Sequence, residues 1–332
     1  MNSLTPFETA EPDEDAMVED LIGILRRKME RDYAAGATKR DAHPKHVGLL
    51  RASFSVEPDL PLHLRVGVFA QAATYDSWVR LSNANGTPQS DAVADIRGCA
   101  IKLLGVVGEP IAESDEPGSQ DFLLVSIPTM PLGTVKLFHD AIYYSIERSR
   151  LFFLAKMLLT GQSRVLTELQ RAKTHPTSPL DIRYWSTTPY RFGTDRVVKY
   201  SLRPTSARRS VLPSTLSDNY LSDNLQQHLA QADASFDFML QLRTEPAAMP
   251  VEDSAVEWRE EASPFVKVAT LRIASQDFRT AERDELAEAL AFSPAHARVE
   301  HRPLGAVNRA RMRIYKALSD FRRQRDRRTA AP

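Results

Sequence analysis

One tyrosine of the chain lies where it could act as a metal ligand, in the segment VNRARMRIYKALSDFRR at residues 307–323. In a helix, residues four and seven positions apart fall on nearly the same face, so Arg311, Tyr315 and Arg322 form one stripe. A guanidinium one turn away from a tyrosine favours the phenolate form. A phenolate is a hard anionic oxygen ligand that suits ferric iron. The alternative is that Tyr315 packs in the core while the arginines point to solvent.

The elements that must position this tyrosine include both helices and strands. Apolar residues recur at helical spacing from Glu14 to Tyr33, and Gly36 follows as a stop signal. From Val47 to Val125 the pattern changes to short runs separated by turn residues, which predicts antiparallel strands. Helix is predicted for residues 134–171, and three strands follow, RVVKYSLRP, SFDFMLQLRT and FVKVATLRIA. Two further helices are predicted near residues 279–290 and 306–325.

The order of these elements indicates the fold class. Strands and helices do not alternate regularly, as a doubly wound parallel sheet would require. We therefore predict an α+β fold, an antiparallel β-barrel or strongly curved sheet with helical insertions and a C-terminal helix. Residues 1–15 are predicted to form a disordered acidic tail, and residues 16–327 a single domain.

The overall composition excludes some classes of function. The chain has 332 residues with 43 basic and 43 acidic side chains, and this zero net charge gives no support for nucleic-acid binding. Cys99 is the only cysteine, so no internal disulfide can form, as is common in the cytoplasm. The N-terminus lacks the features of a signal peptide, and the apolar run Leu151–Leu159 is too short to span a bilayer. We expect a cytoplasmic protein with no transmembrane segment.

Five motifs, taken in order along residues 38–325, resemble those of the catalases. They are Arg40-Asp41-Ala42-His43-Pro44-Lys45, Arg80-Leu81-Ser82, Asp95-Ile96-Arg97-Gly98, Ala291-Phe292-Ser293-Pro294-Ala295, and the Arg311…Tyr315…Arg322 helix. The length of the chain resembles that of the small catalase-related haem proteins, the short form without the C-terminal flavodoxin-like domain. The resemblance implies a barrel of about eight strands, a C-terminal haem-ligating helix and ferric haem b as cofactor.

The resemblance also implies roles for individual residues. Tyr315 is the proximal ligand of the haem iron, as tyrosine is in catalases, and Arg311 polarises its oxygen. His43 is the distal acid–base residue, and Ser82 hydrogen-bonds it and fixes its tautomer. The remaining cofactor-binding residues are three arginines that pair with haem propionates or line the proximal side and a phenylalanine near the haem, namely Arg40, Arg80, Arg322 and Phe138.

Two departures from the catalase pattern affect the expected reaction. Val125, or Ser126 after a slip of one residue, occupies the position of the distal asparagine, and Met130-Pro131 replaces a pair of phenylalanines. The distal pocket is therefore expected to be wider and less suited to holding H2O2. We predict a peroxidase that acts on H2O2 or organic hydroperoxides with an organic reductant. The alternatives are a small catalase, an enzyme that converts lipid hydroperoxides, and a non-catalytic haem-binding protein. The expected partners are the peroxide and a small or lipid-like substrate, with a homo-oligomer as a further candidate assembly.

Overall fold

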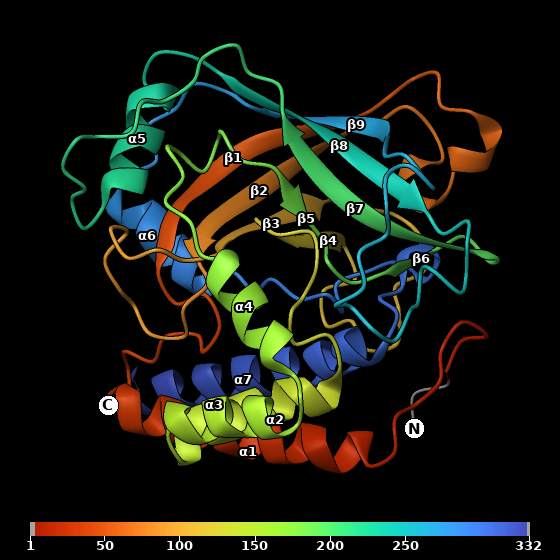
Figure 1. Ribbon diagram of the computed structural model, residues 1–332. Coiled ribbons are helices and arrows are strands. Elements are labelled where there is room, and N and C mark those ends of the chain that lie inside the picture. The colour runs from red at the N-terminus through yellow and green to blue at the C-terminus, as the bar shows by residue number, and fades with distance from the viewer. Residues whose placement is uncertain (1–3, 331–332) are drawn as a thin grey trace.

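The computed structural model describes residues 4–330, whose centre is a closed antiparallel barrel (Figure 1). Eight strands form the ring in the order β5-β4-β3-β2-β1-β9-β8-β7, which closes because β5 also pairs with β7. A ninth strand, β6, is attached to β7 outside the ring. The predicted antiparallel barrel of about eight strands is confirmed. The strands are β1 (His46–Val56), β2 (Thr74–Asn83), β3 (Arg97–Leu104), β4 (Ser119–Val125), β5 (Tyr184–Trp185), β6 (Tyr190–Phe192), β7 (Arg196–Pro204), β8 (Ala234–Leu242) and β9 (Val266–Ile273).

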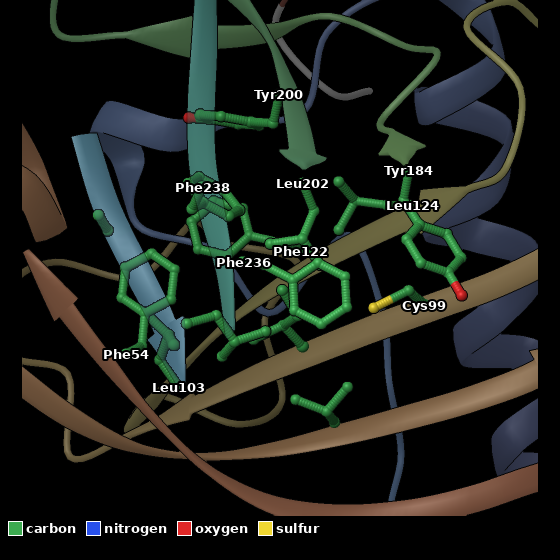
Figure 2. Packing of buried hydrophobic residues seen from close by; sticks show 14 of the residues in the cluster. Phe54, Cys99, Leu103, Phe122, Leu124, Tyr184, Tyr200, Leu202, Phe236 and Phe238 are labelled. Carbon is green, nitrogen blue, oxygen red and sulfur yellow. The ribbon is translucent and has the colours of Figure 1, made fainter. Parts of the chain in front are cut away.

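Aromatic side chains fill the inside of the barrel (Figure 2). The ring centroids of Phe54 and Phe238 are 5.0 Å apart, and those of Phe122 and Tyr200 are also 5.0 Å apart, both in edge-to-face arrangements. Such pairs stabilise a core beyond the area that they bury. Because these rings occupy the interior, the barrel is a packed core. Any binding site for a large ligand must therefore lie outside it.

Helices cover the barrel at two places (Figure 1). Five helices lie on one side, namely α1 (Glu14–Asp32), α2 (Val135–Glu147), α3 (Arg150–Leu159), α4 (Ser163–Arg171) and α7 (Ala306–Ala330). Leu21 and Leu25 of α1, Val135 of α2 and Ile314 of α7 form a second hydrophobic core there. The other two helices, α5 (Tyr220–Leu229) and α6 (Ala281–Ala289), lie at another edge of the barrel. No helix within residues 4–330 combines the length and the apolar character needed to cross a bilayer.

Residues 4–15, part of the segment predicted to form a disordered acidic tail, contact the rest of the chain, and residues 1–3 lie outside the described residues. Glu8 accepts a hydrogen bond from the backbone of Gly305 at 2.9 Å, and it pairs with the buried Arg309 at 2.8 Å. Phe7 packs against a small core that contains Trp258 and Leu304. A disordered segment would not make these contacts. The acidic residues that suggested disorder are here the partners of a buried arginine, which a composition-based argument cannot detect.

Candidate functional site

A cavity of about 370 Å³ lies between the barrel and the helices α1, α2 and α7. Side chains alternate between the two faces of a strand, so Arg80 and Ser82 point out of the barrel while Val79 and Leu81 point into its core. All eight residues that the sequence singled out line this cavity, namely Arg40, His43, Arg80, Ser82, Phe138, Arg311, Tyr315 and Arg322. Most of the remaining lining is apolar, including Leu25, Val135, Ile142 and Ile314.

Tyr315 and Arg311 lie one turn apart on α7, as the spacing predicted. The Arg311 guanidinium lies over the Tyr315 ring, 5.4 Å from its centroid. Asn308, one turn earlier, accepts a hydrogen bond from Arg311 at 3.2 Å and is itself held by Thr188. Burial alone would lower the pKa of Arg311, but Tyr315 and Tyr190 outweigh it and raise the pKa. The arrangement therefore keeps a positive charge beside the phenol oxygen.

On the barrel side of the cavity, His43 forms a pair with Ser82. Nδ1 of His43 lies 3.0 Å from Oγ of Ser82, and Arg80 donates a hydrogen bond to the backbone carbonyl of His43 at 3.0 Å. Burial, and then the charges of Arg80, Arg311 and Arg40, lower the pKa of His43 to about 3. The imidazole is thus neutral at ordinary pH and keeps one unprotonated ring nitrogen, but burial and the nearby arginine charges make it a weak base while the cavity holds no anion.

Gly98 of β3 makes the close approach of this pair possible. A Cβ atom at position 98 would lie 2.6 Å from Nδ1 of His43 and 2.6 Å from Oγ of Ser82. Real Cβ atoms do not make contacts this short. The glycine of the Asp95-Ile96-Arg97-Gly98 motif is therefore required by its position under the histidine.

Three arginines, Arg40, Arg80 and Arg322, gather at one end of the cavity near the carboxylate of Glu288. Arg40 donates to the carbonyls of Ala287, Glu288 and Leu290 at the end of α6, at 2.8, 3.2 and 3.0 Å. Burial, followed by the charges of Arg80 and Arg322, lowers the pKa of Arg40 well below its usual value. Burial and the charge of Arg322 lower the pKa of Arg80 to about 10, although Glu288 opposes this shift.

Glu288 is the residue of this group that sequence reasoning missed. One of its oxygens lies 3.9 Å from Arg322, and the other lies 3.5 Å from His46. Although burial opposes the shift, the hydrogen bond from His46 and the charges of Arg40 and Arg80 lower the pKa of Glu288 to about 2. Glu288 lies on α6, and nothing in its local sequence distinguishes it from the other acidic residues of that helix.

The two departures from the catalase pattern both lie in the cavity wall. Val125 and Met130 line the cavity. Ser126 does not line the cavity, and its Oγ accepts a hydrogen bond from the backbone of Arg97 at 2.9 Å. Of the two residues considered for the position of the distal asparagine, Val125 is therefore the one in the cavity wall.

Sequence reasoning did not assign a role to His296, which also lines the cavity and is held between Asp115 and Asp121, at 2.8 Å from each. No local sequence pattern marks His296, because its two aspartate partners lie 175 and 181 residues away along the chain.

Comparison with known proteins supports the same architecture. No family model matches the sequence, and no curated protein matches it. Among solved structures, a fungal catalase has a TM-score of 0.68 at 17% identity and is matched over 97% of this chain and 65% of its own. A bacterial catalase has a TM-score of 0.65 at 14% identity, over 97% of this chain and 64% of its own. Catalase A from Saccharomyces cerevisiae has a TM-score of 0.67 at 16% identity, over 92% and 64%. The chain thus spans about two thirds of the length of these catalases, and it has a catalase-like fold.

Proposed function

We propose that this chain is a haem-dependent peroxidase that cleaves the O–O bond of a peroxide and takes electrons from an organic reductant. The observation that carries the proposal is the convergence on one cavity of eight residues from segments that lie far apart in the sequence. On α7, the phenol of Tyr315 lies beside the guanidinium of Arg311. On the barrel wall, the neutral imidazole of His43 lines the same cavity. These are the two functions that peroxide cleavage at an iron centre needs, an anionic ligand and a proton carrier.

The charges of the cavity fit haem b. Nε of Arg40 and Nε of Arg80 are buried and have no hydrogen-bond partner among the described residues. Three guanidinium groups lie near the carboxylate of Glu288 there, and the carboxylate of Asp326 also acts on Arg322, which still leaves a positive charge in excess. A buried cation needs an anionic partner, and haem carries two propionates. The apolar side chains Phe138, Ile142 and Ile314 suit the rest of a macrocycle.

In this proposal, ferric haem b supplies the redox chemistry that reduces the peroxide. Tyr315 would hold the iron as a phenolate, and Arg311 would keep negative charge on the phenol oxygen. His43 accepts the proton of the hydroperoxide and returns it to the oxygen that leaves as an alcohol or water. Ser82 holds Nδ1 of His43, so the other ring nitrogen is available for the proton. Two electrons from the reductant and two protons complete the conversion of ROOH to ROH and water.

The wall near His43 favours an organic hydroperoxide over H2O2. Val125 and Met130 offer no hydrogen bond to a second small polar molecule, and they provide apolar contact for an alkyl group. A catalase must bind and orient two H2O2 molecules in turn, which needs polar partners at this wall. We therefore expect cumene hydroperoxide to be reduced with a higher kcat/KM than H2O2 in the presence of an organic electron donor.

The His43→Ala variant tests the proposed role of the histidine. It should retain haem and reduce hydroperoxide more slowly by roughly 10²–10⁴-fold, the usual contribution of a positioned acid–base group. The measurement is the stopped-flow rate with cumene hydroperoxide, and His63→Ala, at an exposed histidine, is the matched control. An unchanged rate removes His43 from the mechanism.

Two further assays of the wild-type protein distinguish the alternative functions. Oxygen evolution from H2O2 without a reductant would favour a catalase. Product formation from a lipid hydroperoxide without a reductant would favour an enzyme that isomerises lipid hydroperoxides.

A further inference from the structure

Helix α3 carries an unusual concentration of exposed apolar side chains. Five of the thirteen large apolar residues that are exposed within residues 4–330 belong to this one short helix. We define the α3 apolar face as Leu151, Phe152, Leu154, Leu158 and Leu159. The exposed fractions of Leu151, Phe152, Leu158 and Leu159 are 74%, 59%, 63% and 87%. Single exposed apolar residues are ordinary, but a contiguous group indicates an interaction surface.

The spacing of these residues shows that the face is a continuous stripe. Leu151, Leu154 and Leu158 are three and four residues apart, which places them on one side of a helix. The opposite side of α3 is already occupied, since Phe153 and Met157 are buried in a cluster with Ala141 of α2. One apolar side of α3 therefore packs against α2, and a second apolar side is exposed to solvent.

The charges around this face indicate what covers it. Residues 148–173 contain six basic side chains and one acidic side chain, whereas the whole chain has no net charge. Arg148, Arg164, Arg171 and Lys173 are exposed on either side of the apolar run. Lys156, the one charged residue between Leu151 and Leu159, is turned inward, where it pairs with Asp140 at 2.7 Å and lies over the Tyr144 ring. The exposed side of α3 is thus apolar, and the segments that precede and follow it in the sequence carry exposed basic residues.

We infer that the α3 apolar face docks on an anionic lipid bilayer. A helix with an exposed apolar side and flanking Lys and Arg residues lies in the plane of a membrane interface, where apolar burial and attraction to anionic headgroups add together. A second copy of this chain fits less well, because a symmetric contact would bring two strongly basic segments together.

The inferred surface lies one helix away from the cavity. Phe138 and Ile142 of α2 line the cavity, while Ala141 of the same helix packs against α3. A bilayer in contact with α3 would therefore be close to the apolar cavity. The docking inference does not depend on the proposed peroxidase, because it requires neither haem nor catalysis.

Vesicle co-sedimentation of the full chain tests the inference. Wild-type protein should bind vesicles of phosphatidylcholine with 30% phosphatidylglycerol more tightly than vesicles of phosphatidylcholine alone, and added salt should weaken the binding. Leu158→Ser/Leu159→Ser should bind at least about tenfold more weakly, because it removes two large apolar contacts. Arg164→Gln/Arg171→Gln should reduce the preference for the anionic vesicles.

The matched control removes two exposed apolar residues elsewhere. Leu62 and Val107 are 83% and 86% exposed, so Leu62→Ser/Val107→Ser should bind vesicles like wild type. Retention of the wild-type circular dichroism spectrum shows that the Leu158→Ser/Leu159→Ser variant is folded. Absence of wild-type binding to either vesicle overturns the inference. So does a lipid-free dimer in sedimentation velocity that dissociates in the Leu158→Ser/Leu159→Ser variant, since the face would then join two copies of the chain.

Discussion

At the scale of residues, the candidate site depends on contacts that its neighbours make possible. His43 has a positive φ of 56°, an uncommon conformation for a residue other than glycine. Its side chain is then held by Ser82, and its carbonyl accepts a hydrogen bond from Arg80. Gly98 leaves the space in which this pair fits. The position of His43 is thus fixed by several of its neighbours together.

The Gly98→Ala variant tests this view of the site. The added methyl would collide with both Nδ1 of His43 and Oγ of Ser82, so the pair must separate. We expect haem binding to persist and the rate of hydroperoxide reduction to fall by at least about tenfold, since a misplaced acid–base group loses much of its effect. Gly118→Ala is the control, because no atom lies within 4 Å of a Cβ at that position. Equal rates for the two variants would contradict the requirement for glycine at position 98.

Some of the site was predictable from sequence and some was not. The stripe of Arg311, Tyr315 and Arg322 follows from helical spacing alone, and the structure has a helix over these residues. The approach of His43 and Arg80 to this helix could be expected only from the resemblance, since pairing of distant segments leaves no local pattern. Glu288 was not predictable in either way, because it reaches the arginines only through the packing of α6 against β1.

At the scale of elements, the long C-terminal helix is held in place by a buried cluster of charges. Arg309 of α7 pairs with Glu8 at 2.8 Å, with Glu14 at 2.7 Å and with Glu252 at 3.0 Å. The cluster joins the N-terminal segment, the start of α1 and the loop after β8 to the helix that carries Tyr315. The predicted α7 began at the correct residue, but these partners were not foreseen, because each of the three carboxylates comes from a different part of the chain.

The Arg309→Gln variant should therefore destabilise the protein. Removal of the cation leaves three carboxylates close together with little exposure, which costs on the order of 3 kcal/mol in the free energy of unfolding. Arg313→Gln is the matched control on the same helix. Its partners Asp15 and Glu19 are exposed, so the loss should be under about 1 kcal/mol. Urea unfolding monitored by circular dichroism measures both values, and similar losses for the two variants would argue against a structural role for the buried cluster.

At the scale of the whole molecule, the barrel forms the main hydrophobic core, and the helices beside it close the cavity. The barrel interior is filled by aromatic rings, so the cavity lies outside it, where the barrel wall meets α1, α2 and α7. The short apolar runs separated by turn residues predicted the antiparallel strands, and the resemblance implied a barrel of about eight of them. The cavity results from the packing of helices against the outer face of this barrel. The cytoplasmic location, the single domain over residues 16–327, the lack of a nucleic-acid partner and the homo-oligomer stay predictions.

Two buried histidines give the haem-free protein a specific dependence on pH. Burial lowers the pKa of both His43 and His301 to about 3, whereas an unfolded histidine has a pKa of about 6.5. Between these values the unfolded state binds more protons, so stability falls as the pH decreases from about 6.5 toward 3. Each histidine contributes a slope of up to about 1.4 kcal/mol per pH unit.

Urea unfolding of haem-free protein at pH 7, 6 and 5 measures this dependence. His43→Gln should reduce the loss of stability between pH 6 and pH 5, because its glutamine does not titrate. His63→Gln, at an exposed position, should leave the slope unchanged. Identical slopes for wild type and His43→Gln would show that His43 is not held neutral in the folded protein.

The most direct test of the account is the absorption spectrum of the purified protein after expression with iron and a haem precursor. We predict a high-spin ferric spectrum with tyrosinate character for wild type. That character should be lost in Tyr315→Phe, while Tyr143→Phe, at a tyrosine outside the cavity lining, should match wild type. A wild-type protein without haem, or a Tyr315→Phe variant with an unchanged spectrum, would contradict the assignment of Tyr315 as the iron ligand.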